Sequence, residues 1–461
     1  MNMNSQTSSH QGFGQRALLV PMMAILAPVV LSTIDISMTS TSLPSIARSI
    51  GIASATSVWI MNSYYLIVVA ALLPFAALGE IYGHRRVFLI GTMLFLVGAL
   101  ASGLAGSLPT LIGSRTILAL GSAAISAVTP ALVRFIYPPS RLGRGLGTYA
   151  LVVALAFTAG PTIASTVLAI AGWRWLYLVH LPFGVVALVV SVYYVPATPR
   201  SHRRFDIASA SLSAAFFAAA LFALAGIAHH LDWSVIALSA IASIALGYLL
   251  LRREQGRSAP ILAVDLFKLP LFSLSSATSI CAFTVQGLAF IVLPFLLHEQ
   301  FGFGQSETGL LITPWPAALA ATVLVVAPLA DRFSPGILAT GGLVILAAGL
   351  ASVAYLPVDA TSMDIVWRLA VCGLGFGFFQ SPNMRAIMAS APPSRSGGAS
   401  GIVAASRLFG QAIGAAIVAL CLSLSGSGGA VLAISIGAGV AIAGSLISAM
   451  RLLARVTKGT S

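Results

Sequence analysis

Long apolar runs recur along the chain, separated by short polar segments. Each run holds about 20 residues, which as a helix spans a hydrocarbon core of about 30 Å. The runs do not alternate between apolar and polar positions as barrel strands do, and only helices and closed barrels satisfy every backbone polar group in lipid. The pattern therefore predicts an all-α integral membrane protein embedded in a lipid bilayer.

Counting these runs predicts 14 transmembrane helices with short connections. The first run is too long for the apolar part of a signal peptide and no cleavage site follows it, so it is interpreted as the first span. The predicted spans are 17–40, 56–78, 87–106, 109–133, 146–170, 174–196, 207–228, 233–251, 273–297, 307–329, 336–357, 363–389, 398–423 and 428–450.

Composition and charge support this interpretation. Of the 461 residues, 58% are hydrophobic and only 8% are charged, whereas soluble domains carry roughly 25% charged residues. The net charge of +13 would favour nucleic acid as the partner of a soluble protein. Here, with the N-terminus inside, 19 of the 24 basic residues fall in the tails or in the loops after even-numbered spans. This is the positive-inside pattern, and it predicts cytoplasmic N- and C-termini and no nucleic-acid partner.

An internal repeat divides the chain. LGEIYGHRRVFLIG (78–91), between the second and third spans, is matched by LADRFSPGILATGG (329–342), with 251 residues separating Glu80 from Asp331. Near the same offset, RTILALG (115–121) is matched by RLAVCGLG (368–375), and Gly160-Pro161 by GQAIG (410–414). Duplicated halves around a midplane cavity are a transporter design. We therefore expect two six-helix bundles plus two extra central helices.

The expected organisation has five parts. They are a cytoplasmic tail (1–16), an N-terminal six-helix bundle (17–196), a linker with two extra transmembrane helices (197–272), a C-terminal six-helix bundle (273–450) and a second cytoplasmic tail (451–461).

Asp35 is the one acidic residue that lies well inside a predicted span. A charge at a helix centre costs about 2.5 kcal/mol or more, so such a residue normally faces a cavity and has a function. The hydroxyl groups of Thr33, Ser37, Ser40 and Thr41 give the same span a polar face. Asp35 is therefore either a proton-binding site or one member of a structural ion pair.

Two basic residues, Arg115 and Arg407, also lie within spans. Each either takes part in coupling or fixes the packing of its helix. Gly160-Pro161 interrupts a helical hydrogen bond, which produces either a hinge or a packing kink. The three cysteines lie in apolar runs and form no CxxC pair, so neither a metal site nor a disulfide is expected. No cofactor is implied.

Motifs along essentially the whole chain resemble those of the fourteen-helix drug:proton antiporters of the major facilitator superfamily. Two departures stand out, since Glu80 replaces the usual Asp of the loop signature and Ile81 its first Arg. The matching segments are Asp35 with Ser37, Ser40 and Leu43-Pro44; Trp59, Tyr64 and Leu66; Gly79-Glu80-Ile81-Tyr82-Gly83-His84-Arg85-Arg86; Arg115; Gly160-Pro161; Trp173-Arg174-Trp175; Ser381-Pro382-Asn383; and Ser406-Arg407 with Gly410.

The resemblance implies alternating access, in which proton entry drives export of a hydrophobic, often cationic compound. The expected transporter works as a monomer in a bacterial cytoplasmic (inner) membrane. In that scheme Asp35 and Arg115 are candidates for proton coupling, and Gly160 and Pro161 for a hinge. The gating motif would comprise Gly79, Glu80, Gly83, Arg85 and Arg86, with Asp331 and Arg332 in its second copy. Candidate cavity-lining residues are Ser37, Tyr64, Trp315, Gln380, Asn383 and Arg407.

The favoured function is a proton-coupled efflux antiporter for small amphipathic compounds such as drugs, dyes and antiseptics. A single mid-membrane acid favours neutral, zwitterionic or monocationic cargo. The alternatives are a dedicated metabolite exporter, a proton-coupled uptake transporter and, from another class, a transporter-like sensor or a membrane enzyme. An enzyme needs clustered catalytic groups, whereas the seven histidines are scattered. The chain has no GxxxxGK[ST] loop, which excludes a nucleotide-driven pump.

Overall fold

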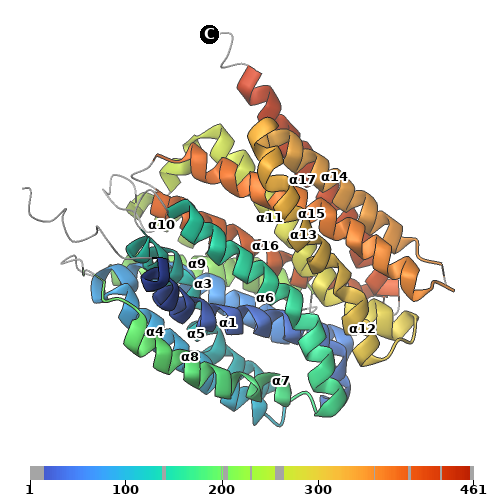
Figure 1. The fold of residues 1–461 in the computed structure, drawn as a ribbon. Coiled ribbons are helices and arrows are strands. Elements are labelled where there is room, and N and C mark those ends of the chain that lie inside the picture. Colours follow the sequence, from blue (N-terminus) through green and yellow to red (C-terminus); the bar gives the residue numbers. More distant parts are fainter. Residues whose placement is uncertain are drawn as a thin grey trace, which may run out of the picture.

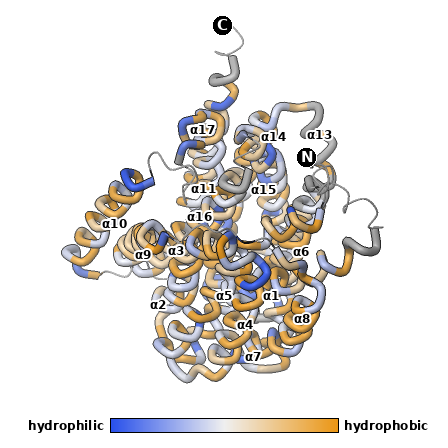
Figure 2. Tube along the Cα trace, turned by 90° about the vertical axis from the view of Figure 1, so that its left-hand side faces the viewer, coloured by the Kyte–Doolittle hydropathy of each residue, from blue (hydrophilic) through white to orange (hydrophobic). Residues whose placement is uncertain are grey.

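The computed structural model describes residues 15–456, except 138–141, 199, 201–205, 229–230, 255–263, 358, 393–395 and 426–427. Within these residues the chain is helical throughout and contains no strand (Figure 1). Apolar residues cover most of the helices (Figure 2). Thirteen helices of the described part are long and apolar enough to cross a membrane. The predicted all-α membrane fold is therefore confirmed.

The N-terminal bundle contains six spans, two of which are interrupted near one end. Its helices are α1 (Gln15–Ile50), α2 (Ser54–Ser57), α3 (Trp59–Tyr82), α4 (His84–Gly103), α5 (Leu108–Ile136), α6 (Leu142–Ile170), α7 (Trp175–Leu178) and α8 (His180–Tyr194).

The C-terminal bundle has the same number of spans. It comprises α11 (Pro270–Phe295), which continues into a π-helical turn (Leu296–Gln300), then α12 (Gln305–Ile312), α13 (Pro314–Arg332), α14 (Pro335–Ala354), α15 (Ser362–Ser390), α16 (Ser396–Ser425) and α17 (Gly429–Val456). The tenth predicted span corresponds to α12 and α13 together. These two helices meet at Thr313, because Pro314 has no backbone N–H with which to continue α12.

The two extra helices are α9 (Ile207–Ala228) and α10 (Trp233–Glu254), and a short 3₁₀ turn (Val264–Lys268) precedes the second bundle. Figure 2 shows α10 at the edge of the molecule, with α9 between it and α3. Aromatic rings join α9 to both bundles: Phe222 lies 6.5 Å from Trp59 of α3, and Phe217 lies 6.2 Å from Phe409 of α16. Of the two linker helices, α9 therefore packs at the junction of the two halves, and α10 packs against α9.

Glycine contacts repeat between the halves. A Cβ atom at Gly98 of α4 would lie 2.3 Å from the backbone nitrogen of Leu118 of α5. At Gly349 of α14, 251 residues later, a Cβ atom would lie 2.7 Å from the sulfur of Cys372 of α15. Both pairs of helices therefore approach to near backbone contact at corresponding positions. The packing follows the same repeat as the sequence.

Hydrogen bonds join the two halves at one end of the molecule. Because the spans cross in alternating directions, α1 begins and α17 ends at the same end of the bundle, here the termini end. At the opposite, far end, the Ser54 hydroxyl donates to Glu299 Oε1 at 2.7 Å. Deeper in, the hydroxyls of Thr162 (α6) and Thr313 lie 2.8 Å apart. These contacts join the N-terminal half to the C-terminal half at the far end.

Candidate functional site

A buried ion pair lies at the centre of the N-terminal half. The Arg115 guanidinium (α5) donates to Asp35 Oδ2 (α1) at 3.3 Å, and the two side chains are 0% and 1% exposed. Arg115 also donates to the hydroxyl of Thr39, one turn along α1, at 3.1 Å. The other carboxylate oxygen of Asp35 has no hydrogen-bond partner among the described residues. Asp35 is therefore one member of an ion pair with one oxygen unused, and its role in binding a proton stays a prediction.

Aromatic rings enclose the Arg115 guanidinium. Its central carbon lies 5.0 Å from the centre of the Tyr64 ring (α3) and 5.5 Å from that of Tyr177 (α7). The ring faces attract the cation and also exclude water from it. Removing one partner of such a desolvated pair leaves an uncompensated charge, which makes the pair strongly interdependent.

The other hydroxyl groups near Asp35 bond to their own helix. Thr33 donates to the carbonyl of Val29 at 2.8 Å, and Thr41 to the carbonyl of Ser37 at 2.9 Å. Ser40 donates to the same Ser37 carbonyl at 3.0 Å. Bonds to a carbonyl three or four residues earlier are the usual solution for a hydroxyl inside a helix. The polar face of α1 is thus largely satisfied by local bonds.

Ser37 differs from these residues because its hydroxyl bonds to a neighbouring helix, close to the Gly160-Pro161 pair. Pro161 has no N–H, so the carbonyl of Phe157, four residues earlier, loses its helical donor. The Ser37 hydroxyl donates to that carbonyl at 2.8 Å. A Cβ atom at Gly160 would lie 2.4 Å from the Cβ of Ser37, so the glycine is what lets α1 come this close. In this structure the pair forms a close junction between α1 and α6; its role as a hinge stays a prediction.

A second polar centre lies in the C-terminal half and lines a cavity with an empty volume of about 440 Å³. Trp315, Gln380 and Arg407, three of the candidate cavity residues, line it. The buried Trp315 Nε1 and Gln380 Oε1 atoms have no hydrogen-bond partner among the described residues. Aromatic rings line the cavity as well, where Phe157 of α6 and Phe290 of α11 lie 4.8 Å apart.

Two glutamines of this cavity, Gln286 and Gln411, were not among the sequence candidates. Gln411 (α16) donates to Gln286 Oε1 (α11) at 3.2 Å. The repeat offset of 251 residues relates Gln286 to Asp35. That offset was the signal that could have identified Gln286, because the two residues hold equivalent places in the first helix of each half.

The three other candidates are not among the residues that line this cavity. Ser37 is engaged with α6, and the Tyr64 ring faces Arg115. Asn383 is 1% exposed and accepts from Arg451 at 2.6 Å, while its amide nitrogen donates to the Ser279 hydroxyl at 2.8 Å. Arg451, assigned to the tail by the sequence analysis, is instead a buried residue of α17. Each of the three is held by other contacts, and their role in lining a cargo cavity stays a prediction.

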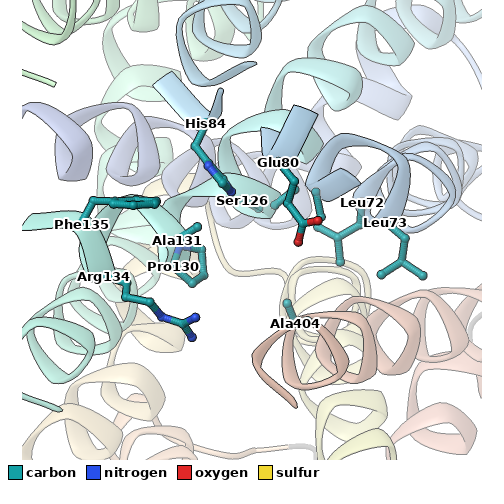
Figure 3. Close-up of a pocket in the computed structure, with 13 residues that line it drawn as sticks. Leu72, Leu73, Glu80, His84, Ser126, Pro130, Ala131, Arg134, Phe135 and Ala404 are labelled. Carbon is teal, nitrogen blue, oxygen red and sulfur yellow. The ribbon is translucent and has the colours of Figure 1, made fainter. Parts of the chain in front are cut away.

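A wider cavity of about 890 Å³ opens at the termini end, between α3 and α5 on one side and α16 on the other. Glu80 and Arg134 both point into it, and Ala404 faces them from the other half (Figure 3). Ala404, Arg407 and Gln411 follow one another at three- and four-residue spacing and so share one face of α16. This face leads from the wide mouth to the inner cavity.

The loop signature connects α3 to α4, and its residues pack against α5 and α8. Gly83 has φ of +95°, a conformation that favours glycine, and a Cβ atom at Gly79 would lie 2.8 Å from Val128 of α5. Arg85 donates to the carbonyl of Val192 at the end of α8, whereas Arg86 is exposed. In the second copy of the motif, the side chains of Asp331 and Arg332 lie outside the described part of the structure.

The sequence profile of the Major Facilitator Superfamily matches residues 25–415. Uncharacterized transporter YebQ of Escherichia coli (strain K12) is 40% identical over 437 residues, covering 94% of this chain and 95% of the relative. Multidrug resistance protein Stp of Mycobacterium tuberculosis (strain CDC 1551 / Oshkosh) is 30% identical over 414 residues, covering 88% and 76% of the two chains.

Among solved structures, a POT family transporter crystallised in complex with 5-aminolevulinic acid superposes with a TM-score of 0.72. It is 17% identical, and the match covers 94% of this chain and 95% of that one, a likeness that shows the fold. The chain belongs to the Major Facilitator Superfamily, as its motifs indicated. It is therefore an integral membrane transporter and not an enzyme.

Proposed function

We propose that this transporter exports small amphipathic compounds in exchange for protons, by alternating access, as a monomer in a bacterial cytoplasmic membrane. The observation that carries the proposal is the buried pair of Asp35 and Arg115. Protonation of Asp35 removes its charge and with it the attraction that holds α1 to α5 at this point. A proton can thereby change how two helices of one half are joined, which a permanent charge cannot do.

The wide mouth and the inner cavity together would form the route of the cargo. The mouth lies at the termini end, while hydrogen bonds between the halves lie at the far end. If both termini are cytoplasmic, as the distribution of basic residues predicts, the cavity of this conformation loads from the cytoplasm. The relative named as a multidrug resistance protein favours export over uptake. Glu80, at the rim of the mouth, is the candidate for a contact that forms when the mouth closes.

Proton exchange can be measured in inside-out vesicles that contain the protein and carry an imposed pH gradient. We expect amphipathic dyes and antiseptics to cause proton release in the wild type and none in Asp35→Asn. Asp359→Asn, which removes an exposed loop acid, is the matched control and should behave as the wild type. Because Asp35→Asn leaves Arg115 unpaired, the double variant Asp35→Asn/Arg115→Gln is measured beside it.

Each outcome has a definite meaning. Loss of proton release in both Asp35 variants, at normal protein levels in the membrane, supports coupling through this pair. Equal proton release in the wild type and both variants would place the coupling group elsewhere. Accumulation of cargo in the direction opposite to export would favour the uptake alternative.

A further inference from the structure

The inner cavity carries a positive charge and no acid among its lining residues. Its walls supply apolar side chains, three glutamines and Trp315, and a single charged residue, Arg407. Asp35, the acid inside the neighbouring half, is already paired with Arg115 and is 1% exposed. A cationic guest would therefore meet repulsion from Arg407 in this cavity and no compensating carboxylate on its walls.

We propose that the inner cavity takes aromatic compounds that carry an anionic group, such as a carboxylate or sulfonate, in preference to aromatic cations. The inference rests on the proposed function, in that this cavity is where cargo binds. It goes further by naming the charge class of the cargo, and it departs from the neutral, zwitterionic or monocationic cargo that a single mid-membrane acid favours.

Arg407 is placed to receive an anion. It lines the cavity from α16 and is half-buried, and neither an ion pair nor a hydrogen bond engages its side chain within the described residues. Other arginines inside the protein differ in this respect: Arg115 bonds to Asp35, and Arg451 bonds to Asn383. An arginine fork binds a planar carboxylate through two parallel hydrogen bonds. Arg407 thus has the chemistry of an anion site and an open cavity in front of it.

Trp315 supplies a second donor. Its indole ring is 0% exposed, and its Nε1 atom, which can only donate, has no hydrogen-bond partner in the described part of the chain. Buried donors without partners are rare, because each costs the hydration it has lost. An acceptor oxygen on the cargo would satisfy this N–H. The unpartnered Gln380 Oε1 can accept from a hydroxyl or amide elsewhere on the same molecule.

The remaining wall suits an aromatic ring. Phe290 lies edge-on to both Phe157, at 4.8 Å, and Trp315, at 5.6 Å, so three rings surround one side of the cavity. A flat ring with one acidic substituent matches both the rings and the two donors.

Binding of three probes that differ in charge tests the proposal. They are 2-naphthoate, 2-naphthamide and 2-naphthylmethylammonium, titrated by calorimetry into the full-length protein in nanodiscs of neutral phosphatidylcholine. A charged hydrogen bond corresponds to about a tenfold change in affinity or more. We therefore expect naphthoate to bind about tenfold more tightly than the ammonium compound, with the amide between them.

Substitutions test which residues produce the preference for the anionic probe. Arg407→Gln should weaken naphthoate binding about tenfold and leave the amide nearly unchanged, whereas Arg407→Lys should keep most of the preference. Trp315→Phe, which keeps a ring and removes the N–H, should weaken naphthoate binding severalfold. Arg368→Gln is the matched control, since Arg368 donates to the Ser352 carbonyl away from this cavity. Its affinities should equal those of the wild type.

Three results would overturn the proposal: tightest binding of the ammonium probe, an unchanged naphthoate preference in Arg407→Gln, or no binding of any probe at millimolar concentration. The assay needs no proton gradient, so it separates the two proposals. Preference for the anion without proton exchange in vesicles would refute the proposed antiport alone. Proton exchange driven by cations but not by anions would refute the charge class alone.

Discussion

The two halves of this transporter share one packing scheme and carry different polar groups at its centre. Asp35 of the first half and Gln286 of the second are separated by the 251-residue repeat. Asp35 pairs with a cation from α5, and Gln286 with an amide from α16. The first pair is enclosed by rings, whereas the second lines a cavity. Duplication thus supplied two equivalent positions that now hold different chemistry.

Under the proposed antiport, this difference separates two tasks. Asp35, whose charge would change with protonation, is held in the sealed half, where an uncompensated ion is most costly. Neutral amides and the half-buried Arg407 line the inner cavity, where cargo would bind. Hydrogen-bonding groups of this kind can orient many compounds without requiring a proton. The comparison can be tested by changing one half at a time.

The largest effect is expected from breaking the ion pair. Arg115→Met leaves the Asp35 carboxylate buried and unpaired, which should lower stability by about 3–5 kcal/mol. Thermal unfolding can be followed with a thiol-reactive dye, because Cys372 and Cys421 are buried in the folded protein. Arg368→Met, in the matching motif of the other half, should cost much less, because Arg368 is partly exposed. Equal losses would contradict the assignment of the sealed charge to the first half.

Glycine substitutions should have the next largest effect. A Cβ atom at Gly342 would lie 2.6 Å from the Gly375 carbonyl, so Gly342→Ala must force α14 and α15 apart, at about 1–3 kcal/mol. The neighbouring Gly341→Ala is the control, because no atom lies within 4 Å of that Cβ position. Gly91→Ala, the equivalent change in the first half, should behave as Gly342→Ala does. A loss in only one half would contradict the shared packing.

Removing one amide of the C-terminal pair should cost less. Gln286→Leu leaves the Gln411 amide without its partner, which corresponds to about 1 kcal/mol of stability or slightly more. Because no charge is uncovered, proton release in vesicles should persist with cargo affinity lowered. Abolished proton exchange in Gln286→Leu, with normal insertion, would show that coupling is shared by both halves.

The smallest effect concerns the junction of α1 and α6. Ser37→Ala keeps the Cβ contact with Gly160 and removes only the bond to the Phe157 carbonyl, about 0.5–1.5 kcal/mol. Ser40→Ala, whose hydroxyl bonds within its own helix, should be nearly neutral. The same unfolding assay measures both variants. A larger loss of stability for Ser40→Ala than for Ser37→Ala would show that the Phe157 carbonyl does not depend on the Ser37 hydroxyl.

The sequence predicted the spans well because hydrophobic length alone defines a crossing of the bilayer. It also identified both members of the ion pair, but their contact joins residues 80 positions apart and required the structure. Gln286 was not predicted because a single amide in an apolar run is not a distinctive pattern, and only the 251-residue offset points to it. The bond between Asn383 and Arg451 could not be predicted, because the last span was expected to end at residue 450, before Arg451, whereas α17 continues to Val456.

The aromatic contacts of α9 bear on how the halves can move. Hydrogen bonds across a junction fix its register, because displacement leaves donors and acceptors unsatisfied in an apolar medium. The ring contacts of Phe222 with Trp59 and of Phe217 with Phe409 depend on no hydrogen bond. They therefore keep much of their contact area when the rings slide past each other. Under the proposed alternating access, α9 could therefore keep its contacts with both halves while they rotate relative to each other.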